Sequence, residues 1–94
     1  MAIVIENWAL VMDRFVKPEE IKNFRTLIGL HGQVFGHPDF EPGYYVLTSW
    51  VAGQKNGLVI TRTGSEYKLG EPSQEYLAFC PNAKQEMMKH LRHL

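Results

Sequence analysis

The hydrophobic and polar positions along the chain divide it into strand-like segments at the start and in the middle, with helix-like segments between and after them. Residues 1–13, MAIVIENWALVMD, begin with β-branched residues and continue with a two-residue alternation. This pattern predicts one strand, or two strands broken near Glu6-Asn7. In such a strand Trp8, Leu10 and Met12 share one face.

The next segment has the pattern of a helix. Pro18 at a first helical position, followed by two glutamates, is a helix-start signal. Apolar residues then follow at helical spacing, namely Ile21, Phe24, Leu27 and Ile28. The pattern predicts a helix that begins at Pro18 and ends at Gly29 or Gly32.

Residues 33–70 are rich in strand-forming residues and contain two hairpin signals. Asn56-Gly57 suits a type I′ turn, and Gly64-Ser65 suits a type II′ turn with glycine first. With Gly64-Ser65 as the loop, Arg62 faces Tyr67 across the hairpin. That register places four apolar residues on one face, namely Leu58, Ile60, Tyr67 and Leu69.

Two registers are open at Asn56-Gly57. A two-residue loop groups three residues with the same apolar face, namely Tyr45, Leu47 and Val51. A five-residue loop over 53–57 instead groups Tyr44, Val46 and Trp50 with it.

After Pro72 the pattern becomes helical again. Ser73 predicts a short turn before Cys80-Pro81, and residues 82–94 predict a terminal helix with Asn82 as its N-cap. The apolar stripe of that helix consists of Ala83, Met87, Leu91 and Leu94. These elements predict an α+β protein, with a small curved antiparallel β-sheet or partial barrel of about 4–5 strands flanked by two helices, the second C-terminal.

Composition narrows the class of protein. The chain has 94 residues, of which 45% are hydrophobic, so we expect a single folded domain over 1–94. Ten Lys and Arg balance ten Asp and Glu, and the chain therefore lacks the broad basic surface of a general nucleic-acid binder. Cys80 is the single cysteine, and no long apolar run is present, so we expect no disulfide, no membrane partner and a location in the cytoplasm.

Histidines and the cysteine are the candidate metal ligands. His90 and His93 are three residues apart on the predicted terminal helix, and His31, His37 or Cys80 would have to complete a site. No paired-cysteine or histidine–glutamate motif accompanies them. We therefore expect solvated histidines at a helix end, a buried structural thiol at Cys80, and no metal or cofactor.

The segment GHPDFEPG, residues 36–43, is the densest polar and turn-rich part of the chain. His37 is a candidate acid–base group with Asp39 or Glu41 as its partner. In the simpler interpretation the segment is a structured loop whose prolines restrict the backbone, with Phe40 inserted in the core. The second interpretation is favoured, so no catalytic residue is predicted.

Aromatic residues on the predicted sheet form the remaining candidate site. Tyr44, Tyr45 and Trp50 could stack nucleic-acid bases, but without interleaved basic residues they are better explained as core or partner-contact residues. Arg62 could contact phosphate, and its predicted position opposite Tyr67 favours a cross-strand pair. Met87 and Met88 suit either the core or a homodimer interface.

Two segments together resemble a set of small phage and prophage proteins of Gram-negative bacteria, mostly uncharacterised. The pattern is Gly-His-Pro-x-Phe-x-x-Gly followed by Thr-Arg-x-Gly-Ser-x-Tyr-x-Leu-Gly, and it matches this chain over 36–43 and 61–70. Val46, Thr48 and Ser49 match between the two segments. The chain departs from the pattern at Pro42 and at the two tyrosines that follow Gly43.

The resemblance implies a phage or prophage accessory protein in the cytoplasm of a bacterial host cell. By analogy with anti-CRISPR proteins, the resemblance also implies that the protein inhibits a host defence complex. The leading hypothesis is a non-enzymatic protein that binds a host protein or protein complex, through His37, Asp39, Tyr44, Tyr45, Trp50 and Arg62. The alternative is a small barrel that binds single-stranded nucleic acid or DNA, using Arg62, Lys55, Lys68 and the aromatic residues.

Overall fold

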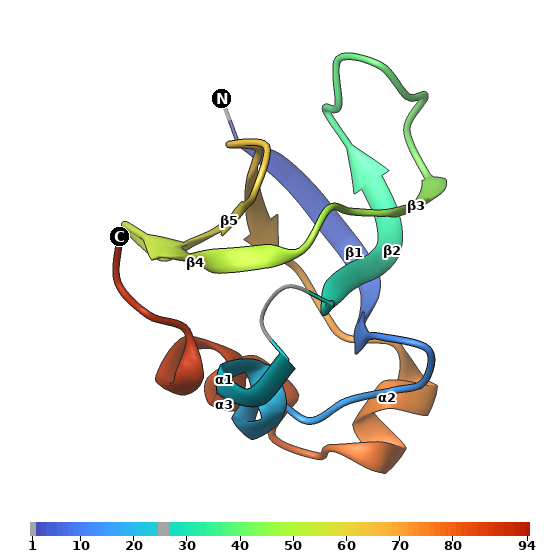
Figure 1. The fold of residues 1–94 in the computed structure, drawn as a ribbon. Coiled ribbons are helices and arrows are strands. Elements are labelled where there is room, and N and C mark those ends of the chain that lie inside the picture. The colour runs from blue at the N-terminus through green and yellow to red at the C-terminus, as the bar shows by residue number, and fades with distance from the viewer. Residues whose placement is uncertain (1, 25–26) are drawn as a thin grey trace.

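The computed structural model describes residues 2–24 and 27–94 and has an α+β fold, as the sequence predicts (Figure 1). Its strands are β1 (Ile3–Val11), β2 (Gly29–Phe35), β3 (Tyr44–Leu47), β4 (Val51–Lys55), β5 (Leu58–Thr61) and β6 (Glu66–Leu69). Its helices are a 3₁₀ turn (Pro18–Glu20), α1 (Ile21–Phe24), α2 (Gln74–Phe79) and α3 (Ala83–His90). Within the described part of the chain, no helix has the length and apolar character to cross a membrane.

All six strands belong to one sheet in the order β3-β2-β1-β6-β5-β4. The sheet is mixed, because β1 pairs parallel with β6 while the other pairs are antiparallel. The predicted class is therefore confirmed, whereas the sheet has more strands than predicted and is not wholly antiparallel. The parallel pair joins the first strand to the last, and no local pattern indicates such a pair.

The sheet is strongly curved because its two edge strands are consecutive in the chain. Only residues 48–50 separate β3 from β4, and such a connection spans at most about 14 Å. In a flat six-stranded sheet the outer strands would lie about 24 Å apart. Hydrogen bonds from Val51 N–H to the Ile28 carbonyl (2.8 Å) and from Arg62 N–H to the Trp50 carbonyl (2.9 Å) hold the bent connection against both halves. The result is a partial barrel that does not close.

Strand β1 confirms the single-strand prediction and contains an irregularity where the break was expected. The register with β2 shifts between Glu6 and Ala9, and Asn7 has a positive φ of 51°. This bulge allows Trp8, Ala9 and Leu10 all to be buried, which a regular alternation would not permit.

The helix predicted from Pro18 to Gly29 or Gly32 is confirmed at its start and wrong at its end. Helical structure ends at Phe24, residues 25–26 of the predicted helix lie outside the described residues, and β2 begins at Gly29. A Cβ atom at Gly32 would lie 2.9 Å from the Glu6 carbonyl oxygen, so this glycine permits the close approach of β2 to β1. Its role is to pair strands and not to end a helix.

The β4–β5 hairpin has the two-residue loop that was one of the two predicted registers. Lys55 pairs with Leu58, and Asn56 and Gly57 both have positive φ (54° and 78°), as a type I′ turn requires. The five-residue alternative is wrong.

The predicted register of the β5–β6 hairpin is also wrong. Val59 pairs with Tyr67, and Thr61 N–H donates to the Ser65 carbonyl (3.1 Å), so the loop has three residues, 62–64. Gly64 is the third of them, with φ of 88°, as in a type I turn followed by a left-handed residue. The register differs from the predicted one by three residues, an odd number, so β5 presents its opposite face. Val59 and Thr61 are therefore buried beside Tyr67 in place of Leu58 and Ile60.

The helices gather at one end of the sheet and close the core there (Figure 1). The Ser73 side chain caps α2 by accepting a hydrogen bond from Tyr76 N–H (3.1 Å), which confirms the predicted turn after Pro72. The Tyr76 hydroxyl donates to the Val16 carbonyl (2.6 Å) inside the core. Helix α3 buries Ala83 and Met87, as predicted.

The chain leaves the helix after His90, and its last three residues run along β4. Gln54 N–H donates to the Arg92 carbonyl and Leu94 N–H donates to the Gln54 carbonyl, both at 2.8 Å. The predicted helical stripe is therefore wrong at Leu94, which is half exposed beside the sheet. We call Arg92–Leu94 the C-terminal tail.

Candidate functional site: an open groove beside strand β3

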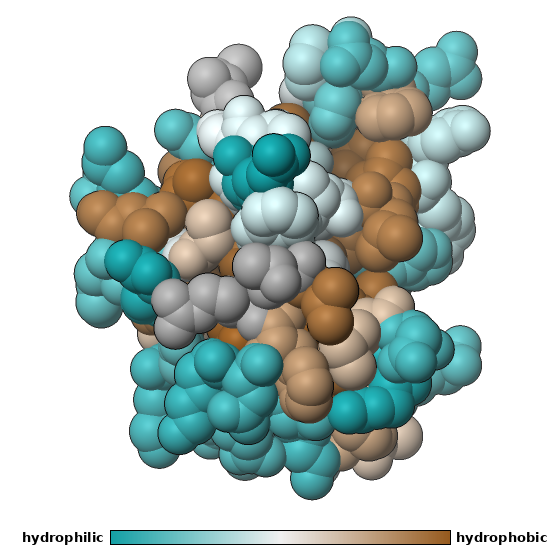
Figure 2. Space-filling model, viewed as in Figure 1, coloured by the Kyte–Doolittle hydropathy of each residue, from teal (hydrophilic) through white to brown (hydrophobic). Residues whose placement is uncertain are grey.

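Strand β3 is an edge strand with large exposed apolar side chains. Tyr44, Tyr45 and Leu47 are 56%, 54% and 65% exposed, and β2 is the strand with which β3 pairs. In Figure 2 a hydrophobic surface, coloured brown, lies over β3 below the loop that follows β2. Exposed apolar residues gathered in this way mark interaction sites more often than single ones do.

The loop 36–43 is held against the start of β3 by its own hydrogen bonds. Gly43 N–H donates to the Val34 carbonyl (2.8 Å), and Tyr44 N–H donates to the Glu41 carbonyl (3.1 Å). His37 Nδ1 accepts a hydrogen bond from the Asp39 main-chain N–H at 3.0 Å. The histidine thus bonds to the backbone of Asp39, and this contact orders the loop.

Aromatic rings continue from the loop onto the strand. The Phe40 and Tyr44 rings are stacked with centroids 5.2 Å apart, and His37 meets Phe40 edge-on at 4.7 Å. Tyr45 stacks on His31 of β2 at 5.6 Å. These contacts orient the rings before any partner arrives, which lowers the entropy lost on binding.

A groove of about 470 Å³ lies between β3 and the β5–β6 hairpin. Its lining consists of His37, Asp39, Phe40, residues 44–49, Thr63, Ser65 and Tyr67. The volume lies within the range of small-ligand pockets, about 300–1,000 Å³, although this groove is open along its length. One wall is therefore aromatic, and the other carries hydroxyl groups.

The hydroxyl-bearing wall is ordered by side-chain contacts. The hydroxyls of Thr61 and Thr63 lie 3.3 Å apart, and those of Ser49 and Thr63 lie 3.4 Å apart. Burial raises the pKa of the Tyr67 hydroxyl above its ordinary value, and a hydrogen bond with Ser65 acts in the opposite direction. Tyr67 is therefore a neutral group of this wall at physiological pH.

Four of the six residues predicted to contact a partner line this groove, namely His37, Asp39, Tyr44 and Tyr45. The other two lie together beyond its end, where the Arg62 guanidinium is 4.6 Å from the centre of the Trp50 ring. The predicted pairing of Arg62 with Tyr67 is wrong, because the three-residue loop turns Arg62 toward the connection between β3 and β4.

The sequence interpretation missed two residues of the exposed surface. Phe40 was assigned to the core, but its side chain is 40% exposed and stacks on Tyr44. Leu47 was grouped with the apolar face in one of the two open registers. The segment YYVL gave no signal of this exposure, since exposed edge strands usually carry charged residues and this one carries none.

The candidate metal ligands do not converge. Helix α3 ends at His90, so His93 lies in the C-terminal tail and the predicted three-residue spacing on a helix is wrong. His90 Nε2 is 3.2 Å from Glu86 Oε2. In residues 2–24 and 27–94, no three potential metal-ligating side chains gather in one place.

Cys80 is buried at the end of α2, as predicted, and burial raises the pKa of its thiol. A raised pKa lowers the thiolate fraction on which nucleophilic attack depends. Structural packing therefore accounts for this cysteine.

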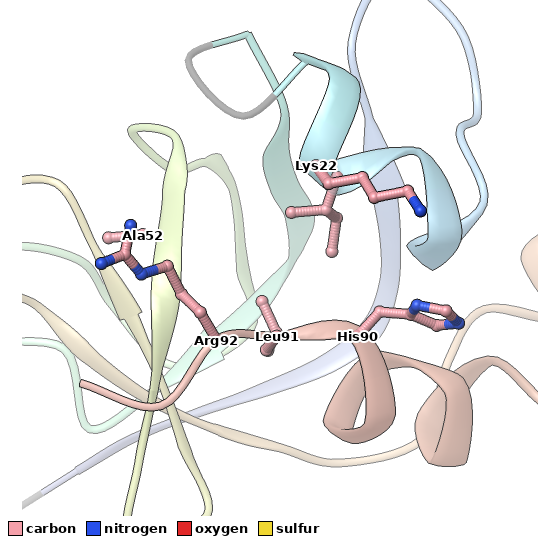
Figure 3. A pocket seen from close by; sticks show the side chains of 6 residues that line it. Lys22, Ala52, His90, Leu91 and Arg92 are labelled. Atoms are coloured by element: carbon pink, nitrogen blue, oxygen red, sulfur yellow. The ribbon is translucent and has the colours of Figure 1, made fainter.

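A small crevice of about 40 Å³ beside α3 is lined in part by Lys22, His90 and Arg92. Figure 3 shows that Arg92 extends to the opposite side from Lys22 and His90, so the three side chains do not meet over the crevice. The crevice therefore lacks a convergent set of cations for an anionic ligand.

Comparison of the chain with models of protein families, with curated proteins and with solved structures finds no match. The functional interpretation of this chain therefore rests on the geometry and the side chains of the groove.

Proposed function

We propose that this protein acts without catalysis, by binding another protein through the surface formed by Phe40, Tyr44, Tyr45 and Leu47, which we call the β3 surface. The observation that carries this proposal is the exposure of three large side chains on one four-residue edge strand. A monomer gains nothing in stability from leaving them in water, whereas a partner that covers them gains their burial.

The composition of the β3 surface is typical of an interface centre. Aromatic residues are enriched at such centres, and charged residues are depleted there. Tyrosine in particular combines a large apolar ring with a hydroxyl that stays hydrogen-bonded. The ring stacks with Phe40 and His31 support the same role, because they restrict the two tyrosines in advance.

The biological setting follows from the sequence resemblance to phage and prophage proteins. We place the protein in a bacterial host cell, where its partner is a host protein or complex, with a defence assembly as the leading target. Small size and side chains ordered in advance along one exposed strand suit an inhibitor that acts by occupying a site on its target.

The alternative, binding of single-stranded nucleic acid, has weaker support from the geometry. Its basic residues lie on separate elements: Lys55 at the β4–β5 turn, Arg62 in the next hairpin loop and Lys68 on β6. Arg62 also covers one side of the Trp50 ring, on which a base would have to stack.

The proposal is tested with the double variant Tyr44→Ala/Tyr45→Ala. Wild-type and variant proteins are immobilised, exposed to lysate of a Gram-negative host, and each captured protein is purified and titrated in a calorimeter. We expect the double variant to bind about 30-fold more weakly or worse, because truncation of even one central aromatic residue costs about 2 kcal/mol or more.

The matched control is Leu27→Ala, which truncates a side chain that is 63% exposed but lies outside the groove. This variant should bind as the wild type does. Equal binding by the wild type and the double variant would overturn the proposal, as would purified partners that fail to bind the wild type.

A further inference from the structure

The backbone of β3 offers hydrogen-bonding groups along its outer edge. Thr48 N–H donates to the Leu30 carbonyl (2.8 Å), so the backbone groups of Thr48 face β2. Val46, two residues earlier, pairs with Gly32 in the same register and also faces β2. Because successive residues of a strand direct their N–H and C=O groups to opposite sides, those of Tyr45 and Leu47 point away from β2. Strand β3 ends the sheet order, so these groups face no further strand.

Apart from the short length of β3, this edge lacks the features that normally prevent pairing with another chain. The segment Tyr44–Leu47 contains no charged residue and no proline, and its register with β2 is regular. Natural proteins usually protect an exposed edge with such residues, with a bulge or with a covering segment. An unprotected apolar edge is suited to accept a strand.

The groove beside the edge has room for a single extended chain. Thr63 and Ser65 form its opposite wall, and the groove is about 470 Å³ in volume. A lone segment can lie between this wall and β3. A second copy of this protein would bring its own β2 beside its β3, and that strand would occupy the place of Thr63 and Ser65.

The lining also indicates the chemistry of the segment. Among the described residues that line the groove, Asp39 is the only carboxylic acid, and none is a lysine or an arginine. An added strand would have apolar neighbours on both faces of the sheet. Tyr45 and Leu47 lie on one face, and Tyr44 and Val46 lie on the other. The complementary segment therefore carries β-branched or aromatic side chains. Its one charged residue is a lysine or arginine at the position that meets Asp39.

We infer that the groove binds an extended segment of a partner protein, which pairs through its backbone with β3 as an added strand. This inference rests on the proposed protein-binding function and specifies how the partner is held. In this mode main-chain hydrogen bonds supply affinity, and the side chains along the groove supply selectivity.

The first experiment separates backbone pairing from side-chain contact at one position. Leu47→Pro removes an outward N–H from an edge strand, where proline is tolerated, and Leu47→Ala removes the same side chain but keeps the N–H. The probes are linear twelve-residue peptides selected from a random displayed library on the wild-type protein. We expect Leu47→Pro to bind the selected peptides roughly tenfold more weakly than Leu47→Ala, because a carbonyl of the peptide is left without a donor.

The second experiment uses the wild-type protein and therefore does not depend on the folding of a variant. Each selected peptide is synthesised twice, with N-methyl groups on its odd-numbered or on its even-numbered amides. In an added strand only one of these sets faces β3, so we expect one series to lose binding and the other to retain it. Protection of the Tyr45 and Leu47 amides from hydrogen exchange should accompany binding.

Three results would overturn the inference: equal binding by Leu47→Pro and Leu47→Ala, equal effects of the two N-methyl series, or a selection that returns no linear peptide. Each leaves the proposed function intact if the double tyrosine variant still loses its partner. A dimer in sedimentation that Leu47→Pro dissociates would instead identify a second copy as the occupant, and would also overturn the inference.

Discussion

One edge of the sheet, β4, is covered by another segment of the chain, whereas the other edge, β3, is exposed. Along β4 the C-terminal tail forms hydrogen bonds to both backbone groups of Gln54, at 2.8 Å each. Along β3 no such segment lies among the described residues, and Tyr44, Tyr45 and Leu47 are more than half exposed. Both edges belong to one curved sheet and are joined by only residues 48–50.

The residues of β4 show how specifically its edge is covered. A Cβ atom at Gly53 would lie 2.5 Å from the Arg92 carbonyl oxygen, so the tail packs where only glycine leaves space. The Gln54 side chain is buried and donates from Nε2 to the carbonyls of Met88 (2.7 Å) and Leu91 (3.2 Å). The same chain thus covers one edge with a closely fitted segment and leaves the other exposed. This difference is what the proposed binding role of β3 requires.

The largest loss of stability should come from Gln54→Leu, on the covered edge. The substitution leaves two carbonyls at the end of α3 without a donor, and we expect the free energy of unfolding to fall by about 2–4 kcal/mol. Urea denaturation followed by circular dichroism measures this loss. Lys55→Leu, an exposed neighbour on the same strand, is the control and should change stability little. If Gln54→Leu unfolds at the same urea concentration as the wild type, this side chain does not anchor the tail.

A smaller effect is expected from Gly53→Ala, through its clash with the tail. In the full chain we expect a loss of about 1–3 kcal/mol, because the tail must shift to admit the methyl group. In a chain that lacks Arg92–Leu94 the same substitution should cost less than about 0.5 kcal/mol, since nothing then opposes it. Denaturation of the four proteins completes the cycle, and equal costs in both backgrounds would contradict the proposed contact.

The same truncated chain offers a second measurement. Removing the tail uncovers the backbone of β4 and gives the sheet two open edges. Sedimentation should then show association that increases with protein concentration beyond that of the full chain.

The smallest effect should come from Leu47→Lys on the open edge. Because this side chain is mostly in water, we expect the free energy of unfolding to change by no more than about 0.5 kcal/mol. Val46→Lys, at the neighbouring half-buried position, should destabilise the protein clearly more. A loss above about 1 kcal/mol for Leu47→Lys would mean that Leu47 already packs against the protein.

Local turn chemistry made one hairpin predictable and misled the prediction of the other. Asn56-Gly57 needs two residues with positive φ, which few other pairs provide, and its loop was among the predicted registers. Gly64 can occupy either the first place of a two-residue loop or the third of a three-residue loop. Pairing of Val59 with Tyr67 decides between them, and this choice depends on which face the core covers.

The candidate site was partly predictable for a simple reason. His37, Asp39, Tyr44 and Tyr45 are close in sequence, so any compact arrangement of the loop and strand brings them together. The far wall of the groove, with Thr63 and Ser65, comes from a distant hairpin. The position of Arg62 over Trp50 likewise depends on contact between two separate segments.

Features that depend on near neighbours could be predicted from the amino-acid order: the α+β class, the capped helix after Ser73, the turn at Asn56-Gly57 and the apolar stripe of α3. Propensity, capping and turn geometry act over a few residues, and the pattern records them directly. Contacts between distant segments decided that residues 29–32 form a strand, that β1 pairs parallel with β6, and that one sheet edge is covered while the other is open. Those outcomes depend on burial and strand pairing across the whole chain, and such contacts override local preference.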